Sequence, residues 1–223
     1  KNEGYNLKTF FKKNNLNYKS FSISELNVVG KINNEEISET VKTSGRPYIP
    51  GSTIKGALRT AIVYYYLKKN GYNLSKIGNF YNGQDIFGRY AKDKFKYLHV
   101  SDTNPLKHDD LVIVQSNNWD LKENKDTISI IREAISSDKN CEIRIQSKAR
   151  EGINKLSFLQ KNNETDIINM VNNYTEDNLK KEISTLKKYG DSKLNNLISA
   201  YNEIYNEIKK LNRNKKGMIL RIG

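Results

Sequence analysis

The sequence is poor in the residues that secreted and membrane-spanning proteins rely on. Only one of its 223 residues is a cysteine, so no disulfide can form within the chain. Such scarcity is typical of proteins kept in a reducing compartment. No apolar run reaches the roughly 18 residues that indicate a membrane-spanning helix. The composition therefore predicts a cytoplasmic protein that contacts no membrane.

Catalytic and metal-ligating side chains are also scarce. The only histidines are His99 and His108, and no paired cysteines or His-x-x-x-His pattern occurs. His99 lies in an apolar stretch, where a buried imidazole with hydrogen-bond partners is more common than a general base. His108 lies in a polar loop beside Asp109 and Asp110, and adjacent loop carboxylates are usually solvated. We therefore expect no metal, no cofactor and no intrinsic catalytic site.

The charge of the chain points to its partner. Lysine and arginine exceed aspartate and glutamate by 38 to 25, which gives a formal net charge of +13 and a pI near 9.5. This balance disfavours self-association and favours a polyanionic partner, which on charge alone is either nucleic acid or an acidic membrane surface. A hydrophobic content of 36% is nevertheless enough for a folded core.

The most informative stretch is Gly45 to Leu67. Pro50 and Gly51 indicate a turn, Ser52 is a good N-cap, and apolar residues then recur at helical spacing. These apolar residues are Ile54, Ala57, Leu58, Ala61, Ile62 and Tyr65. The pattern predicts a helix that begins near Ser52 and buries one face.

Two residues in the first turns of this helix are unusual. Lys55 places a cation near the positive end of the helix dipole, and Gly56 costs about 1 kcal/mol relative to alanine in a helix interior. Both fit a phosphate bound across the helix N-terminus by free backbone N–H groups and Lys55. Gly56 would then let another backbone come close, and Arg59 would extend the anion track. The alternative is a capped core helix with a solvated lysine, and spacing alone leaves both open.

Basic residues alternate with aromatic ones over residues 85–97. Surfaces of this kind bind single-stranded RNA, because cations contact phosphates while rings stack on bases. We interpret Phe87 and Phe95 as core residues, and Arg89 and Tyr90 as the RNA contacts.

Residues 141–146 alternate between apolar and polar side chains and predict a strand with a buried Cys141. Arg144 lies on its polar face, and Lys148 and Arg150 continue the basic series. These three basic residues either contact backbone phosphate or line a solvated strand edge, and both interpretations stay open.

Three segments carry a family likeness. Residues 48–60 read YIPGSTIKGALRT, residues 97–102 read YLHVSD, and residues 216–223 read KGMILRIG. The first resembles the Pro-Gly-Ser-Ser/Thr-x-x-Lys-Gly-Ala-x-Arg signature of the RAMP superfamily, the RNA-binding proteins of CRISPR effector complexes. The other two resemble that family's strand ending in Ser-Asp and the strand that leads into its glycine-rich loop. The likeness is greatest to the cap subunits of type III-A complexes.

This resemblance implies an RNA-binding assembly subunit of a Csm complex, which caps the backbone filament at the 3′ part of the crRNA and supports maturation of the crRNA 3′ end. The implied partners are crRNA, the repeated backbone subunit, the small subunit and recruited host nucleases. The expected RNA-binding residues are Arg46, Ser52, Thr53, Lys55, Arg59, Arg89, Tyr90, Arg144, Lys148 and Arg150. The alternative is a metal-independent RAMP endoribonuclease that processes precursor crRNA, with His108 as its candidate acid or base.

The resemblance also implies an α+β fold with an RRM-like (ferredoxin-like) core and helical and loop insertions. We expect one such domain over residues 1–223, with a sheet built from strands near Tyr97, Leu111, Cys141 and Met218. The expected additions are an N-terminal helix and hairpin at 1–44, an irregular loop insertion at 117–139 and a helical pair at 166–213. Within 166–213, local patterns predict Thr175 as a helix N-cap and Gly190 as a helix C-terminal cap. A second domain is expected to lie largely outside this chain.

Overall fold

The computed structural model describes residues 7–22, 24–32, 36–72, 83–147, 156–159 and 164–222. The chain divides into two compact units, whereas the sequence predicts one domain. Unit 1 comprises Lys1–Pro47, Leu106–Asn118 and Asp126–Asn140. Unit 2 comprises Tyr48–Pro105, Trp119–Lys125 and Cys141–Gly223. The units interleave in sequence because most of the long hairpin at residues 111–135 belongs to unit 1, whereas its tip and the segments on either side of it belong to unit 2.

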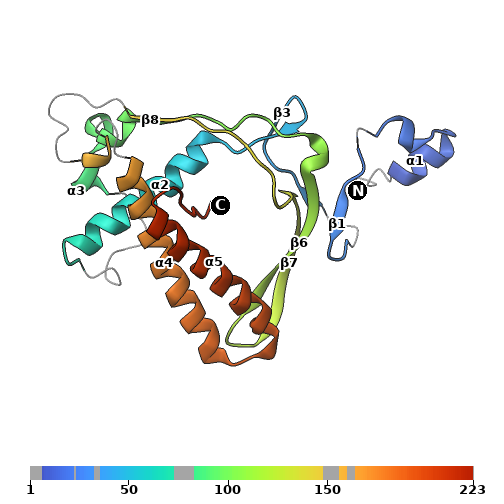
Figure 1. The fold of residues 1–223 in the computed structure, drawn as a ribbon. Coiled ribbons are helices and arrows are strands. Elements are labelled where there is room, and N and C mark those ends of the chain that lie inside the picture. The colour runs from blue at the N-terminus through green and yellow to red at the C-terminus, as the bar shows by residue number, and fades with distance from the viewer. Residues whose placement is uncertain are drawn as a thin grey trace. The chain divides into compact units, whose positions relative to one another are not determined.

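Unit 1 is built on a four-stranded sheet with the order β1-β6-β7-β2 (Figure 1). Its strands are β1 (Asn27–Val29), β2 (Ile37–Ser38), β6 (Leu111–Asp120) and β7 (Lys125–Ile135). β1 pairs in parallel with β6, and β2 pairs in parallel with β7. The remaining elements of unit 1 are α1 (Leu7–Lys13), η1 (Tyr18–Ser20), the antiparallel pair β3 (Lys42–Thr43) and β4 (Arg46–Pro47), and η5 (His108–Asp110).

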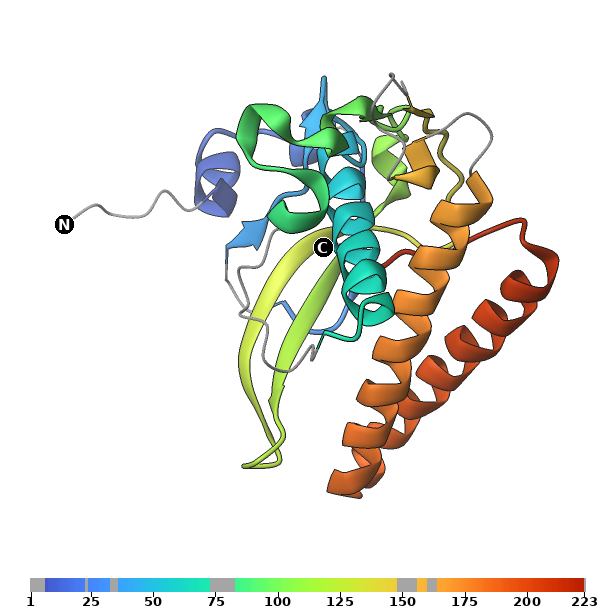
Figure 2. The ribbon, with the colours of Figure 1, turned by 90° about the vertical axis from the view of Figure 1, so that its left-hand side faces the viewer.

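Two predictions for this part of the chain are wrong. A hairpin between Val28 and Ile37 does not form, because β1 and β2 lie at opposite edges of the sheet with β6 and β7 between them. The range 117–139, predicted as an irregular insertion, is largely strand, and β6 and β7 form a long hairpin (Figure 2). Trp119 lies in β6 rather than in a loop, and the ammonium of Lys193 is 5.1 Å from the centre of its ring.

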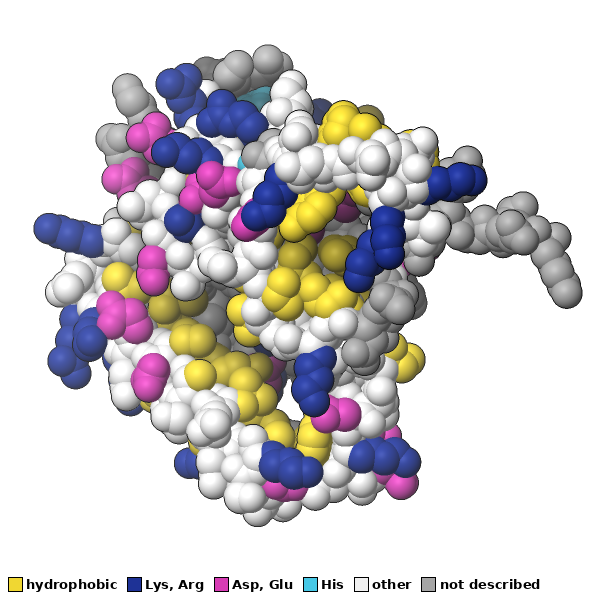
Figure 3. Space-filling view, turned by 90° about the vertical axis from the view of Figure 1, so that its right-hand side faces the viewer, with side chains coloured by type: hydrophobic (Ala, Val, Ile, Leu, Met, Phe, Trp, Pro, Cys, Tyr) yellow, Lys and Arg dark blue, Asp and Glu magenta, His cyan; other side chains and the backbone are white. Residues whose placement is uncertain are grey.

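The four-stranded sheet exposes apolar side chains. Val29 is 61% exposed and Ile128 66% exposed, whereas Ile131, which points to the other face of β7, is buried. Figure 3 shows hydrophobic side chains at the surface among lysine and arginine residues. One face of this sheet is therefore only partly covered by the described residues of unit 1.

Unit 2 contains the long helices, namely α2 (Gly51–Lys69), α4 (Glu164–Tyr189) and α5 (Asn195–Asn214). Its strands β5 (Leu98–Val100) and β8 (Ile145–Ser147) pair in antiparallel fashion. Short helices complete it: α3 (Gln84–Phe87), η3 (Tyr90–Lys92), η4 (Lys94–Tyr97), η6 (Ser157–Leu159) and η7 (Ser192–Leu194). α4 packs against both α2 and α5 (Figure 2). No helix in the described ranges is both long and apolar enough to cross a membrane.

The main core of unit 2 lies where α2 and α4 meet. Leu58 and Ile62 of α2 and Val171 of α4 are fully buried there, together with Phe87 and Phe158. α4 runs without a break, although the sequence predicts a second helix that begins at a Thr175 cap. Thr175 instead lies buried inside the helix, where its hydroxyl donates to another segment.

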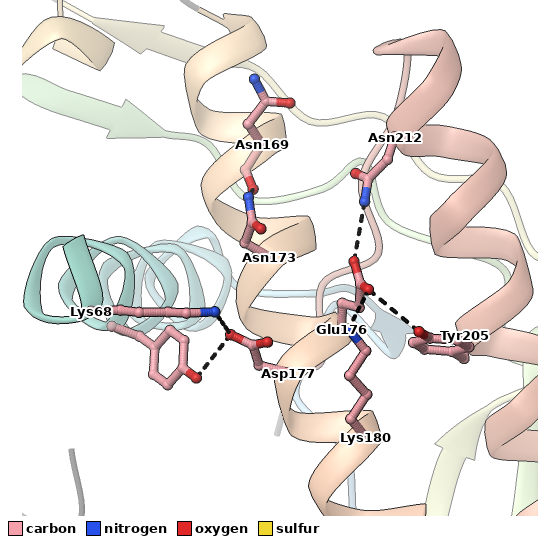
Figure 4. Close-up of polar contacts among 9 residues, drawn as sticks. Lys68, Asn169, Asn173, Glu176, Asp177, Lys180, Tyr205 and Asn212 are labelled. Atoms are coloured by element: carbon pink, nitrogen blue, oxygen red, sulfur yellow. Dashed lines mark hydrogen bonds and ion pairs between the residues drawn. The ribbon is translucent and has the colours of Figure 1, made fainter. Parts of the chain in front are cut away.

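Two adjacent carboxylates of α4 connect it to both neighbouring helices (Figure 4). Asp177 accepts hydrogen bonds from Lys68 Nζ at 2.5 Å and from the Tyr64 hydroxyl at 3.0 Å, both on α2. Glu176 lies 3.5 Å from the Tyr205 hydroxyl of α5. Because residues next to each other on a helix point in different directions, one turn of α4 serves two partners.

The segment near Met218, predicted as a sheet strand, is an extended segment held by α4. Asn172 is fully buried, and its Nδ2 donates to Gly217 O at 3.0 Å while its Oδ1 accepts from Ile219 N–H at 3.1 Å. The Thr175 hydroxyl donates to Ile219 O at 2.7 Å. Two side chains of a helix thus provide the pairing that a neighbouring strand would otherwise provide.

The single sheet expected from strands near Tyr97, Leu111, Cys141 and Met218 is therefore wrong as assigned. β5 and β8 form one sheet, and the strand that begins at Leu111 belongs to another. Cys141 lies before β8 and is half-buried rather than buried. The observed class is nevertheless a mixture of helix and strand, as expected.

Replacement of Asn172 tests how the extended segment is held. We expect Asn172→Ala to lower the free energy of unfolding by about 2–3 kcal/mol, because it leaves a backbone carbonyl and an N–H without partners in a buried site. Asn173→Ala is the matched control, since Asn173 is exposed and donates only within α4, to Asn169 O. Urea unfolding measures both variants, and equal losses would contradict this role of Asn172.

Candidate nucleic-acid interface

The predicted helix exists, but its first turn is capped differently from the prediction. α2 begins at Gly51, and Pro50 is the N-cap with φ −61° and ψ 133°. Ser52 is an exposed residue of the first turn rather than the cap. The side chain that binds the helix start comes from elsewhere, because Asp102 Oδ1 accepts from Gly51 N–H at 2.7 Å.

The start of α2 is seated on the segment that follows β5. A Cβ atom at Gly51 would lie 2.4 Å from Val100 O and 2.5 Å from Ser101 O, so only glycine permits this approach. Two further hydrogen bonds fix the segments: Thr103 N–H donates to Ile49 O at 3.1 Å, and Ile49 N–H donates to Thr103 Oγ1 at 2.9 Å. Gly51 and Thr103 are buried, whereas Ser101 and Asp102 at the same junction are exposed.

The backbone N–H groups of the first turn are mostly committed. Gly51 N–H is bound by Asp102, and the N–H groups of Thr53 and Ile54 donate to Pro50 O at 3.0 and 3.3 Å. The hypothesis of a phosphate held by free N–H groups is therefore wrong for these three donors. An anion that approached this helix end would also meet the Asp102 carboxylate.

Arg59 is half-buried, and its contacts are made within the fold. Its Nη1 pairs with Asp93 Oδ2 at 2.8 Å, and its guanidinium carbon lies 4.6 Å from the ring centre of Phe87 and 5.3 Å from that of Phe95. Both rings are almost fully buried, which confirms their prediction as core residues. The other oxygen of Asp93 accepts from Phe95 N–H at 2.8 Å and caps η4. Arg59 thus stacks on the core while Asp93 offsets its charge.

Lys55 lies beside this cluster and differs from Arg59 in its environment. It is half-buried, and its Nζ lies 5.5 Å from the ring centre of Phe95. Burial lowers the pKa of Lys55 below its usual value, the nearby Arg59 charge lowers it further, and the Asp93 charge partly opposes both. A phosphate next to Lys55 would favour the charged ammonium, which the protein itself stabilises incompletely.

The exposed surface next to Lys55 is built from small residues. Ser52, Thr53 and Thr60 are exposed, and Gly56 has no atom within 4 Å of the position that a Cβ would occupy. The close backbone that the sequence predicts at Gly56 is therefore not provided by any of the residues that the structure describes. The open surface leaves room for an external one.

The other predicted RNA contacts are spread over the chain. Arg144 is exposed, and its backbone bonds to Ser101, the residue against which Gly51 packs. Arg89 is exposed after α3. Arg46 is exposed in β4 of unit 1, where its Nε donates to Leu106 O at 3.2 Å. The side chain of Tyr90, and the residues Lys148 and Arg150, lie outside the described part of the structure.

The two histidines are placed differently. His99, predicted as a core imidazole, is exposed on β5, so that prediction is wrong. His108 is half-buried in unit 1, and its Nδ1 is 2.5 Å from the Ser24 hydroxyl. Among the residues that the structure describes, no three His, Cys, Asp or Glu side chains are grouped so as to hold a metal ion.

Comparison with known proteins identifies the family. A family profile described as the RAMP superfamily matches residues 27–222. The chain belongs to the RAMP superfamily. The match includes all of α2, so the seated glycine, Lys55 and the open surface at Gly56 are features of a RAMP protein.

Curated relatives of this RAMP chain carry the name CRISPR system Cms protein Csm5. The one from Streptococcus thermophilus is 31% identical over 144 residues, which cover 56% of this chain and 37% of the relative. The one from Methanocaldococcus jannaschii is 28% identical over 158 residues, which cover 63% and 38%. The chain thus spans less than two fifths of the length of these relatives.

Solved structures share the RAMP fold of this chain. The crystal structure of T. onnurineus Csm5 has a TM-score of 0.70 at 22% identity, covering 97% of this chain and 72% of that one. A chain of the cryo-EM structure of a Csm–crRNA–target RNA ternary complex, from a type III-A CRISPR-Cas system, has a TM-score of 0.53 at 20% identity. The alignment with that chain covers 84% of this protein and 60% of the chain in the complex.

The two glycines of the RAMP signature are expected to respond oppositely to substitution. Gly51→Ala is expected to destabilise the protein by more than about 2 kcal/mol, because its methyl group would overlap two backbone carbonyl oxygens. Gly56→Ala is expected to stabilise the free protein by roughly 0.5–1 kcal/mol, because it meets open space in a helix interior. Urea unfolding of both variants tests this, and destabilisation of similar size in both would contradict it.

Proposed function

We propose that this chain is an RNA-binding assembly subunit of a type III-A CRISPR effector complex. It caps the backbone filament at the 3′ part of the crRNA and supports maturation of the crRNA 3′ end. Its partners are crRNA, the repeated backbone subunit and the small subunit of the Csm complex. The names of the relatives and the net charge of +13 support this assignment.

One observation identifies the residues that support this proposal. The RAMP signature presents Lys55, a lysine whose charge is incompletely stabilised, beside the open surface at Gly56. Such a surface suits a sugar-phosphate backbone, because the cation attracts phosphate and the missing side chain permits close approach. Contacts of this kind bind RNA without reading its sequence, as a subunit that accepts any guide requires.

The proposal includes an RRM-like core for unit 2. Along the chain, a segment at 48–49 is followed by α2, β5, β8, α4 and the segment that contains Met218. This is the β-α-β-β-α-β order of ferredoxin-like folds. The β6–β7 hairpin then lies between the second and third strands of that order, as an insertion.

The salt dependence of RNA binding tests the role of Lys55. We expect Lys55→Ala to weaken binding of a labelled single-stranded RNA by about 3- to 10-fold, because a phosphate contact is lost. The slope of log K against log salt should flatten by about 0.7, the value for one phosphate of a single strand. Lys188→Ala, at an exposed lysine far along α4, is the matched control. An unchanged slope in Lys55→Ala would contradict the proposal.

Two further variants sharpen that experiment. Gly56→Ala, expected to stabilise the free protein, should weaken RNA binding because its methyl group narrows the open surface. Arg59→Ala should lower stability instead, because Asp93 and two buried rings lose their partner. If Gly56→Ala binds RNA more tightly, the RNA does not bind at the surface beside Gly56.

The alternative of a metal-independent endoribonuclease depends on His108. Its contact with the Ser24 hydroxyl orients the ring, but a serine hydroxyl is not a carboxylate that would stabilise an imidazolium. We expect purified protein to bind a repeat-derived RNA without cutting it, and His108→Ala to change nothing in a gel-based cleavage assay. Cleavage by the wild type that is lost in His108→Ala would favour the enzyme.

A further inference from the structure

A pocket lies at the far end of α2 from the signature. It has a volume of about 280 Å³ and is lined by Tyr64, Tyr65, Lys68 and Lys69 of α2 and by Asn173 of α4. At 1.5 Å per residue, Tyr65 lies about 15 Å along the helix axis from Lys55. The pocket is therefore separate from the surface at Gly56, although one rigid helix carries both.

The wall of this pocket is held in place by α4 (Figure 4). Asp177 binds both the Tyr64 hydroxyl and the Lys68 ammonium. The edge of Tyr174 packs against the Tyr64 ring with 5.1 Å between ring centres. Burial, together with the Asp177 carboxylate, raises the pKa of Tyr64 to about 12. The hydrogen bond to Asp177 and the packing against Tyr174 hold the Tyr64 ring in place before any ligand arrives.

The charge around the pocket favours an anion. Lys68 and Lys69 line it, and Lys181 Nζ lies 5.5 Å from the centre of the Tyr64 ring. Asp177 offsets one of these three cations, so a positive excess remains. A pocket bordered by aromatic rings and lysines has the chemistry that single-stranded nucleic acid requires, with rings for bases and cations for phosphates.

The size of the pocket and the position of its amide narrow the ligand further. Its volume is close to the lower end, about 300 Å³, of small-molecule sites, which suits one base rather than a larger group. Asn173 Nδ2 donates to Asn169 O at 2.7 Å, so its Oδ1 is the atom placed to accept from an N–H group of a ligand. Every RNA base has an N–H group on its pairing edge.

We propose that this pocket binds one unstacked base of single-stranded RNA, with a neighbouring phosphate held by Lys69. The inference rests on the proposed RNA-binding function and adds a base site to a surface otherwise directed at the backbone. RNA is favoured over an acidic peptide because Tyr64 and Tyr65 offer ring surface, which carboxylates do not use. The base would be held by shape and stacking rather than by sequence.

Two oligonucleotides with the same number of phosphates test the proposal. One is a single-stranded RNA, and the other is its abasic counterpart. Wild-type protein is expected to bind the RNA at least about 5-fold more tightly, since stacking on an aromatic ring adds to phosphate binding. Asn173→Ala should lower the affinity for the RNA by about 3-fold and leave the affinity for the abasic strand unchanged. Lys69→Glu should weaken the binding of both strands by more than the charge-matched Lys188→Glu does.

A crosslinking measurement keeps the test independent of stability. RNA that carries 4-thiouridine, irradiated on the wild-type protein, should attach to the peptide that contains Tyr64 and Tyr65. Tyr65→Phe should retain the crosslink because it keeps the ring. Equal affinity for the RNA and the abasic strand would indicate a site for any polyanion and overturn the base pocket.

The two proposals fail in distinguishable ways. If RNA binds and Lys55→Ala flattens the salt slope, but Asn173→Ala and Lys69→Glu behave as Lys188→Glu does, only the base pocket is wrong. If Lys55→Ala leaves the slope unchanged while crosslinks still map to Tyr64 and Tyr65, the backbone surface at Gly56 is wrong instead. Absence of any RNA binding overturns both.

Discussion

The candidate interface depends on how closely the start of α2 approaches the end of β5. Gly51 makes the approach possible, because any side chain there would overlap the carbonyl oxygens of Val100 and Ser101. Asp102 then binds the first N–H of the helix, so the same short segment provides both the seat and the cap. These contacts set the direction of α2. The direction of the helix in turn sets the positions of Lys55 and Gly56 and, further along, of the pocket at Tyr64 and Tyr65.

The two cations of the signature have different roles in spite of their shared face. Arg59 is planar, stacks on Phe87 and Phe95 and is paired with Asp93, so it stabilises unit 2. Lys55 has the same charge on a flexible stem, and burial lowers its pKa without a direct carboxylate partner among the described contacts. One cation is thus used inside the protein, and the other is the one that a phosphate would stabilise.

Local patterns in the sequence predicted the helices better than the sheets. Apolar spacing located α2, and Gly190, with φ of 63°, ends α4 as predicted. Local spacing indicates strands at β1 and β2, but it does not indicate that each pairs in parallel with a strand of a hairpin far along the chain. Thr175 looked like a cap because threonine caps helices, yet its partner is Ile219, more than 40 residues away. The same limit applied to Asp93 and Asp102, whose roles at the site come from contacts across the fold.

α4 holds several parts of unit 2 in place through polar side chains. Its buried Asn172 holds the C-terminal extended segment, its Asp177 fixes Tyr64 and Lys68 of α2, and its Glu176 contacts α5. The rings of the pocket are therefore ordered before RNA arrives, and little side-chain entropy is lost when a base enters. A backbone surface alone would hold any polyanion, including folded nucleic acid. A base pocket on the same helix adds a preference for strands whose bases are unpaired, as those of a single-stranded RNA are.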